Sequence, residues 1–204
     1  MSHRIICYGD SNTYGYDPRS YLGGRYPEAV RWTELLKAEG WEVINQGENG
    51  RSIPKMDYEI EMAVKAIRDS KADILAVMLG SNDLLQRPDL AAESCGGRME
   101  KFLTAVLAET QANLKILLVA PPPMEAGAWV SDPGTIEASR RLAGSYEVTA
   151  HRMGIAFVDA GIWGVGLTYD GVHFSEEGHL AFAKGMRKAL DTLLCFELVS
   201  GGQP

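Results

Sequence analysis

Five short apolar runs alternate along the chain with longer segments of helical length, and this alternation constrains the fold more than any other feature. The runs span residues 4–8, 42–45, 73–79, 115–120 and 156–159. Most are nearly continuous apolar stretches, which is typical of parallel strands covered on both faces. Because strands that alternate with helices form βαβ units with right-handed crossovers, the pattern predicts an α/β fold. We expect a three-layer α/β/α sandwich around a five-stranded parallel sheet.

The helical segments are expected at residues 28–39, 57–70, 98–112, 133–153 and 176–194. In the last of them the apolar residues recur every three or four positions and form a single stripe: Leu180, Ala183, Met186, Leu190 and Leu193. A chain of 204 residues fits one domain with a sizeable core. We therefore expect a single domain over residues 1–204, in which residues 195–204 form a C-terminal tail.

The charge balance argues against two classes of partner, and the cysteine pattern argues against disulfides and a zinc site. Lys and Arg total 20 against 27 Asp and Glu, a net charge of -7, which argues against nucleic acid and anionic membranes as partners. No apolar stretch approaches the roughly 20 residues that span a bilayer, and no secretory signal is recognisable. The three cysteines, Cys7, Cys95 and Cys195, fit neither a disulfide framework nor a zinc pattern, so we expect buried thiols and a cytoplasmic location.

Polar residues follow four of the predicted strands, at the edge where open parallel sheets bind their ligands. The segments are residues 9–12 after the first strand, 45–50 after the second and 80–83 after the third. Residues 170–173 follow the fifth strand about ten positions later. Each segment is common in ordinary turns, and it is their joint occurrence at one end of the sheet that indicates acyl transfer.

Each part of an acyl-transfer site has a candidate. A serine hydroxyl needs a base to remove its proton, and His173 can act as that base for Ser11. Asp170, three residues earlier, can accept a hydrogen bond from the other ring nitrogen and fix the tautomer. The tetrahedral intermediate needs hydrogen-bond donors for its oxyanion. Candidates are the backbone N–H groups of Ser11 and Gly50 and the side-chain amide of Asn82.

These segments resemble the four sequence blocks of the SGNH (GDSL-type) hydrolase family. Residues 6–16, ICYGDSNTYGY, are similar to the first block, and residues 45–50, 80–83 and 170–173 to the others. The resemblance assigns the family roles to Ser11, Gly50, Asn82 and His173, with Asp170 orienting the histidine. In the second block the later glycine, Gly50, is preferred and Gly47 is the fallback. Further similarity at residues 30–32, 121–124 and 157–160 points to the intracellular arylesterase and short-chain acyl esterase branch.

The resemblance implies a flavodoxin-like sheet, a Ser–His–Asp triad, no cofactor and a small-molecule ester as substrate. It leaves a homo-oligomer open, since oligomers are frequent in this branch and no feature of the sequence indicates one. The chain departs from the family at Asn12, where leucine is usual. We expect that position to affect the shape of the pocket rather than the chemistry.

The substrate pocket needs an apolar wall, and the loops after the strands can supply one. Residues 84–97 and 121–134 are expected to be long connections on the active-site side. No long apolar lid is present to cover a fatty chain, so a short acyl group is expected. The candidate pocket residues are Asp10, Asn12, Tyr14, Trp32, Met56, Leu84, Met124 and Trp129.

Other chemistries fit the sequence less well. The α/β-hydrolase elbow Gly-x-Ser-x-Gly is absent because Thr13 replaces its second glycine. The loop with Gly47 and Gly50 lacks the lysine of a Walker phosphate-binding loop. No His, Cys, Asp or Glu residues have the spacing of a metal site. The sequence therefore predicts a serine esterase that hydrolyses short-chain acyl or aryl esters through an acyl-enzyme. A thioesterase or carbohydrate deacetylase with the same triad is the alternative, and a non-catalytic ligand-binding module is a third hypothesis.

Overall fold

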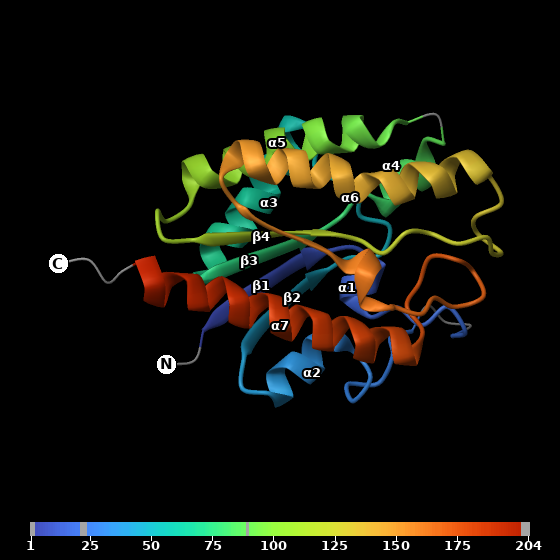
Figure 1. Cartoon of the computed structure of the whole chain (residues 1–204), viewed down its shortest axis with the longest axis horizontal. Coiled ribbons are helices and arrows are strands. Elements are labelled where there is room, and N and C mark those ends of the chain that lie inside the picture. The colour runs from blue at the N-terminus through green and yellow to red at the C-terminus, as the bar shows by residue number, and fades with distance from the viewer. Residues whose placement is uncertain (1–2, 21–23, 89, 201–204) are drawn as a thin grey trace.

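A five-stranded parallel sheet forms the centre of the molecule (Figure 1). The structure, a computed structural model, describes residues 3–20, 24–88 and 90–200, with side chains as far as residue 195. The strand order is β2-β1-β3-β4-β5. Their bounds are β1 (Arg4–Gly9), β2 (Glu42–Gly47), β3 (Ile74–Met78), β4 (Lys115–Ala120) and β5 (Ala156–Asp159). The predicted fold class is confirmed.

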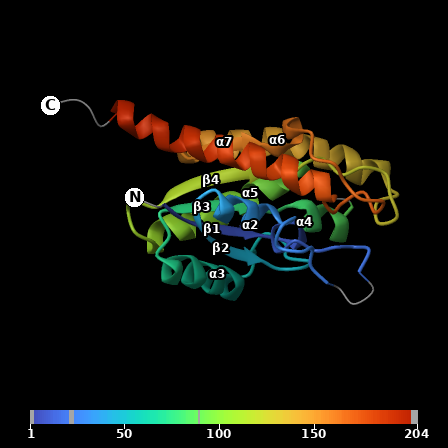
Figure 2. The ribbon, with the colours of Figure 1, turned by 90° about the horizontal axis from the view of Figure 1, so that it is seen from below.

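Helices cover both faces of this sheet (Figures 1 and 2). One face packs against α3, α5 and α6, and the other packs against α2 and α7. The helices are α1 (Ser11–Tyr14), α2 (Trp32–Ala38), α3 (Asp57–Ser70), α4 (Ser81–Gln86), α5 (Ala92–Glu109), α6 (Pro133–Met153) and α7 (Glu176–Ser200), and a 3₁₀ helix, η1, spans Ala160–Trp163.

Side-chain alternation along each strand divides the core into two halves. In β1, Ile5 and Cys7 face α2 and α7, whereas Ile6 and Tyr8 face the opposite layer. Successive residues of a strand point to opposite faces, so both sets can be apolar only when both faces are covered. This explains the continuous apolar runs of the sequence.

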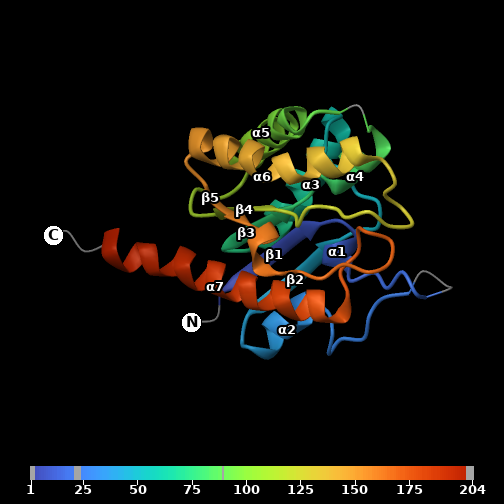
Figure 3. The ribbon, with the colours of Figure 1, turned by 45° about the vertical axis from the view of Figure 1, so that its right-hand side comes forward.

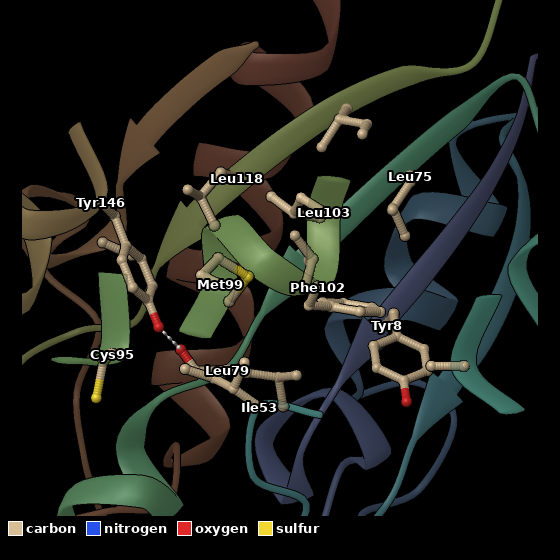
Figure 4. Close-up of a cluster of buried hydrophobic side chains, with 14 of the residues drawn as sticks. Tyr8, Ile53, Leu75, Leu79, Cys95, Met99, Phe102, Leu103, Leu118 and Tyr146 are labelled. Atoms are coloured by element: carbon tan, nitrogen blue, oxygen red, sulfur yellow. Dashed lines mark hydrogen bonds between the residues drawn. The ribbon is translucent and has the colours of Figure 1, made fainter. Parts of the chain in front are cut away.

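The larger half of the core fixes one of the loops after the strands (Figure 4). The ring of Tyr146, from α6, is fully buried there, and its hydroxyl donates a 2.8 Å hydrogen bond to the backbone carbonyl of Leu79. Leu79 lies just beyond β3 and immediately before residues 80–83. The core therefore positions the start of that polar segment.

The predicted strands match the structure closely, whereas two of the predicted helices differ at one end. The helices expected at 57–70 and 133–153 are confirmed as α3 and α6 with the same bounds. The helix expected at 28–39 begins only at Trp32, because residue 31 has an extended backbone. The last helix continues to Ser200 instead of ending at residue 194. Residues 201–204 of the expected tail lie outside the described residues.

The prediction of a long connection at residues 84–97 is wrong. Most of that segment belongs to α4 and to the start of α5, and Leu84, Ala92 and Cys95 are buried in the core. Gly96, within this segment, lies where α5 meets α6. A Cβ atom there would approach Oγ of Ser145 to 2.3 Å, so the glycine permits close packing of the two helices.

The loops that follow the strands gather at one end of the sheet, at the right of Figure 1 and toward the viewer in Figure 3. Helix α1 begins there directly after β1, and the segment between η1 and α7 lies beside it. The four polar segments of the sequence thus come together at the carboxyl edge of the sheet, as predicted.

Candidate active site

Ser11 is the first residue of α1, a short helix that begins where β1 ends. The N–H groups of a first helical turn have no acceptor within the helix, so the Ser11 N–H is left to face a ligand. Asp10 caps this helix, because its Oδ1 accepts a 3.0 Å hydrogen bond from the backbone N–H of Asn12. Burial raises the pKa of Asp10 to about 6, and the hydrogen bond from Asn12 only partly offsets that shift. Asp10, which was predicted as a pocket residue, is thus the buried N-cap of α1.

His173 connects Ser11 to Asp170. Nε2 of His173 lies 2.9 Å from Oγ of Ser11, and Nδ1 lies 2.7 Å from Oδ2 of Asp170. All three residues are buried. With Nδ1 donating to the carboxylate, Nε2 is the ring nitrogen that can accept the serine proton. The structure therefore brings the three predicted residues into the order needed for nucleophilic catalysis.

Asp170 is held by its own turn. Its Oδ1 accepts two backbone hydrogen bonds of 2.9 Å, from the N–H groups of Val172 and His173. Burial raises the pKa of Asp170, but the hydrogen bonds from the His173 ring and from these two N–H groups outweigh it and lower the pKa to about 2. The carboxylate is therefore charged at neutral pH, and a charged acceptor stabilises an imidazolium ring.

Asn12 was predicted to shape the pocket, and in the structure it supports the turn that carries His173. Its side chain is buried against the segment that carries His173. Nδ2 donates a 3.1 Å hydrogen bond to the carbonyl of Val172, and Oδ1 accepts a 2.9 Å bond from the N–H of Phe174. One amide thus binds the backbone on both sides of the histidine. We call this pair of hydrogen bonds the Asn12 clamp.

The loop after β2 supplies the backbone candidate for the oxyanion hole. Within the described part of the chain, the N–H of Gly50 has no hydrogen-bond partner. The N–H of Gly47, the fallback, already donates to Oδ1 of Asn45 over 2.9 Å. Gly50 is therefore the better candidate of the two.

Asn82, the side-chain candidate, contacts the same loop from the start of α4. Its Nδ2 donates a 3.1 Å hydrogen bond to the carbonyl of Arg51, which uses one of two amide protons and leaves the other for an oxyanion. The neighbouring Asp83 accepts a 2.9 Å bond from the N–H of Ile53. These two bonds fasten the loop after β2 to the loop after β3.

Arg51 holds the loop from the other side, a role that was not predicted from the sequence. Its guanidinium donates to the carbonyls of Gly9 and Gln46 and forms a 2.6 Å ion pair with Glu48. It also stacks over the Tyr8 ring, 4.2 Å from the ring centre. The one sequence feature that could have indicated this role is a cationic residue directly after Gly50.

Two aromatic rings lie beside the imidazole of His173. The centroid of the Tyr16 ring is 4.7 Å from that of His173, and the centroid of the Trp129 ring is 4.9 Å away and nearly perpendicular. Trp129 was predicted as a pocket residue, whereas Tyr16 was not. Tyr14 was predicted instead, but α1 ends at Tyr14, and the ring of Tyr14 packs against the guanidinium of Arg25.

Three of the four other residues predicted for the pocket are buried in the core. Trp32, Leu84 and Met124 belong to the buried core and expose 2 % or less of their surface. The indole of Trp32 also donates a 2.9 Å hydrogen bond to the carbonyl of Asn12, so it supports the nucleophile turn from below. Met56 lies half-exposed at the start of α3. Apolar residues near a site are more often part of the core than of the pocket wall.

A second buried histidine, His179, has a structural role. It is buried in α7, and its Nδ1 accepts a hydrogen bond from the N–H of Trp32. Burial, with the nearby charge of Arg31, lowers the pKa of His179 to about 4, so the ring stays neutral.

Among the described residues, no group of three His, Cys, Asp or Glu side chains is arranged to hold a metal ion. None of the helices in the described ranges is both long and apolar enough to cross a bilayer.

The chain is similar to one protein family and to several solved structures. The model of the GDSL-like lipase/acylhydrolase family matches residues 7–181. An aryl esterase from M. smegmatis is 27% identical with a TM-score of 0.76, covering 92% of this chain and 100% of that one. A carbohydrate acetylesterase from Sinorhizobium meliloti is 25% identical with a TM-score of 0.79, covering 94% and 100%. A carbohydrate acetylesterase family member from the same organism is 29% identical, also with a TM-score of 0.79, covering 95% and 99%. No curated protein matches the chain.

Proposed function

The chain belongs to the GDSL-like lipase/acylhydrolase family and is a carboxylic ester hydrolase, and on this premise we propose that Ser11, His173 and Asp170 hydrolyse small esters. The observation that carries the proposal is the continuous chain of contacts from Ser11 Oγ through both ring nitrogens of His173 to Asp170. A serine held in this way has both the base and the orienting carboxylate that its activation requires.

The reaction proceeds in two halves. Nε2 of His173 takes the proton of Ser11 as Oγ attacks the carbonyl carbon, and the carbonyl π electrons move to the oxygen. The N–H groups of Ser11 and Gly50 and the free amide proton of Asn82 donate to that oxyanion. As the tetrahedral intermediate collapses, His173 returns its proton to the departing alcohol, and an acyl-serine remains. Water, deprotonated by the same ring, then releases the acid and restores Ser11.

The substrate we propose is a short-chain acyl ester, with an aryl or sugar alcohol as the leaving group. Similarity to both an aryl esterase and carbohydrate acetylesterases supports these two classes equally. A thioester is the further alternative. A panel of aryl acetates, acetylated sugars and acyl-thioesters separates the three, and a series from acetyl to dodecanoyl esters tests the acyl length. Activity that rises steadily with chain length would contradict a short acyl group.

The first experiment compares the hydrolysis of p-nitrophenyl acetate by the wild type and by Ser11→Ala. We expect turnover to fall by several orders of magnitude, with about 10⁶ as the extreme for such catalytic units. Ser94→Ala, an exposed serine in α5, is the matched control and should retain full activity. Covalent labelling by a fluorophosphonate provides a second readout, because only an activated serine reacts. Equal activity of both serine variants would rule out Ser11 as the nucleophile.

A further inference from the structure

The mechanism determines on which side of the site the alcohol part of an ester must lie. To receive the proton of His173, the leaving oxygen must come within about 2.6–3.2 Å of Nε2. The carbonyl oxygen lies elsewhere, against the candidate donors Gly50 and Asn82. The carbon skeleton of the alcohol therefore occupies the space next to the imidazole, whereas the acyl group extends away from it.

That space is bordered by the rings of Tyr16 and Trp129. Both ring centres lie within 5 Å of the centre of the imidazole, at 4.7 and 4.9 Å, and they are 6.4 Å from each other. Trp129 exposes 54% of its surface. Much of the indole therefore faces solvent, although the ring contacts the base of the proposed reaction.

Trp129 is held in place by the segment that it flanks. Its backbone N–H donates a 3.1 Å hydrogen bond to the carbonyl of Asp170, and the N–H of Ala128 donates to the carbonyl of Tyr169 over the same distance. The two segments approach so closely that a Cβ atom on Gly127 would lie 2.4 Å from the carbonyl carbon of Asp170. Only glycine fits there. The backbone that carries the indole is thus attached to the same turn as Asp170, which keeps Trp129 beside His173.

A large aromatic side chain that is fixed and half-exposed beside a reacting group is suited to binding a flat ring. Aromatic faces attract the polarised C–H edges of other rings, and the fixed position lowers the entropy lost on binding. We propose that Trp129, together with Tyr16, forms a leaving-group subsite that stacks a six-membered ring of the alcohol. This inference rests on the proposed function, since it requires His173 to protonate the leaving oxygen. An aryl ring and a pyranose share the required shape.

The test measures kcat and KM for three acetates that differ only in the alcohol: phenyl acetate, a monoacetylated methyl glucopyranoside and ethyl acetate. For Trp129→Ala we expect KM to rise about tenfold for at least one of the ring esters and to stay within twofold for ethyl acetate. Trp129→Phe, which keeps an aromatic ring, should have a KM close to that of the wild type. Tyr58→Ala, which removes a side chain of similar exposure from α3, is the matched control.

The pattern of losses identifies the alcohol and separates the two proposals. A loss confined to phenyl acetate supports an aryl leaving group, and a loss confined to the acetylated sugar supports a pyranose. Equal losses of kcat on all three esters would mean that Trp129 only orients His173 or Asp170, and they would overturn the subsite. Unchanged kinetics on all three would overturn it as well. A wild type that cleaves none of the esters and is not labelled at Ser11 would instead refute the proposed function, and the subsite with it.

Discussion

The Asn12 clamp offers the sharpest test of how this site is held together, and Asn12→Leu is the perturbation of choice. Leucine is close to asparagine in size but can neither donate nor accept a hydrogen bond. The substitution therefore removes the donor to the carbonyl of Val172 and the acceptor of the N–H of Phe174. Both backbone groups are buried beside His173, so water cannot replace the lost partners without rearrangement.

The expected loss of stability follows from the number of groups left unpaired. A buried backbone group without a partner costs about 1–3 kcal/mol, so the two together cost about 2–6 kcal/mol. That is a large fraction of the roughly 5–15 kcal/mol that stabilises a typical domain. Activity should fall as well, because a displacement of about 1 Å in a catalytic group can cost about 100-fold. We expect kcat to fall about 10- to 100-fold while KM is unchanged.

Three measurements on one preparation check this prediction: urea unfolding, steady-state kinetics and the low-field proton NMR signal of the His173 Nδ1–H. Gln111→Leu is the control, because it removes an amide that donates 2.8 Å to the carbonyl of Ala72, far from His173. It should lower the stability and leave kcat and the NMR signal unchanged. A free energy of unfolding within about 1 kcal/mol of the wild type, together with an unchanged kcat, would show that the Asn12 clamp neither stabilises the fold nor orients His173.

Three further predictions follow from the site. Asn82→Ala should lower kcat by about 10²–10³, the usual effect of losing one oxyanion donor, and wild-type turnover in a p-nitrophenyl acetate assay would exclude Asn82 from that role. Burial raises the pKa of Asp10 from 3.8 to about 6, so the fold favours the protonated carboxyl. The contribution of Asp10 to stability is therefore complete below pH 3.8 and is lost as the pH rises through 6. Asp10→Asn should therefore gain up to about 3 kcal/mol over the wild type at pH 8 and little at pH 4, measured by urea unfolding at both. The contribution of His179 to stability has the opposite pH dependence. Its pKa in the fold is about 4, below the ordinary histidine pKa of 6.5. Its contribution is therefore complete above pH 6.5 and is lost as the pH falls from 6.5 to 4. His179→Gln should remove about 3 kcal/mol of this acid sensitivity, and an unchanged difference between pH 7 and pH 4 would contradict a neutral buried ring.

The sequence alone predicted those features that depend on neighbours close in the chain. The five strands follow from apolar runs that are continuous because both faces of the sheet are covered. Helices α3 and α6 were predicted with their observed bounds, because their apolar residues recur with helical spacing. Asp170 and His173 could be paired from sequence because one turn separates them, and the strand ends indicated where Ser11 and Asn82 would lie.

The tertiary structure decided what each side chain near the site contacts. The Asn12 clamp joins residues more than 150 positions apart, and no local pattern distinguishes a clamping asparagine from one that lines a pocket. Tyr16 was missed and Trp32 was misassigned for the same reason: the end of α1 turns one ring toward His173, while packing against Phe182 buries the other. Local periodicity determines which elements form, because it is set by backbone geometry. Whether a residue belongs to the core, the support or the pocket depends on contacts between distant segments, and those exist only once the chain has folded.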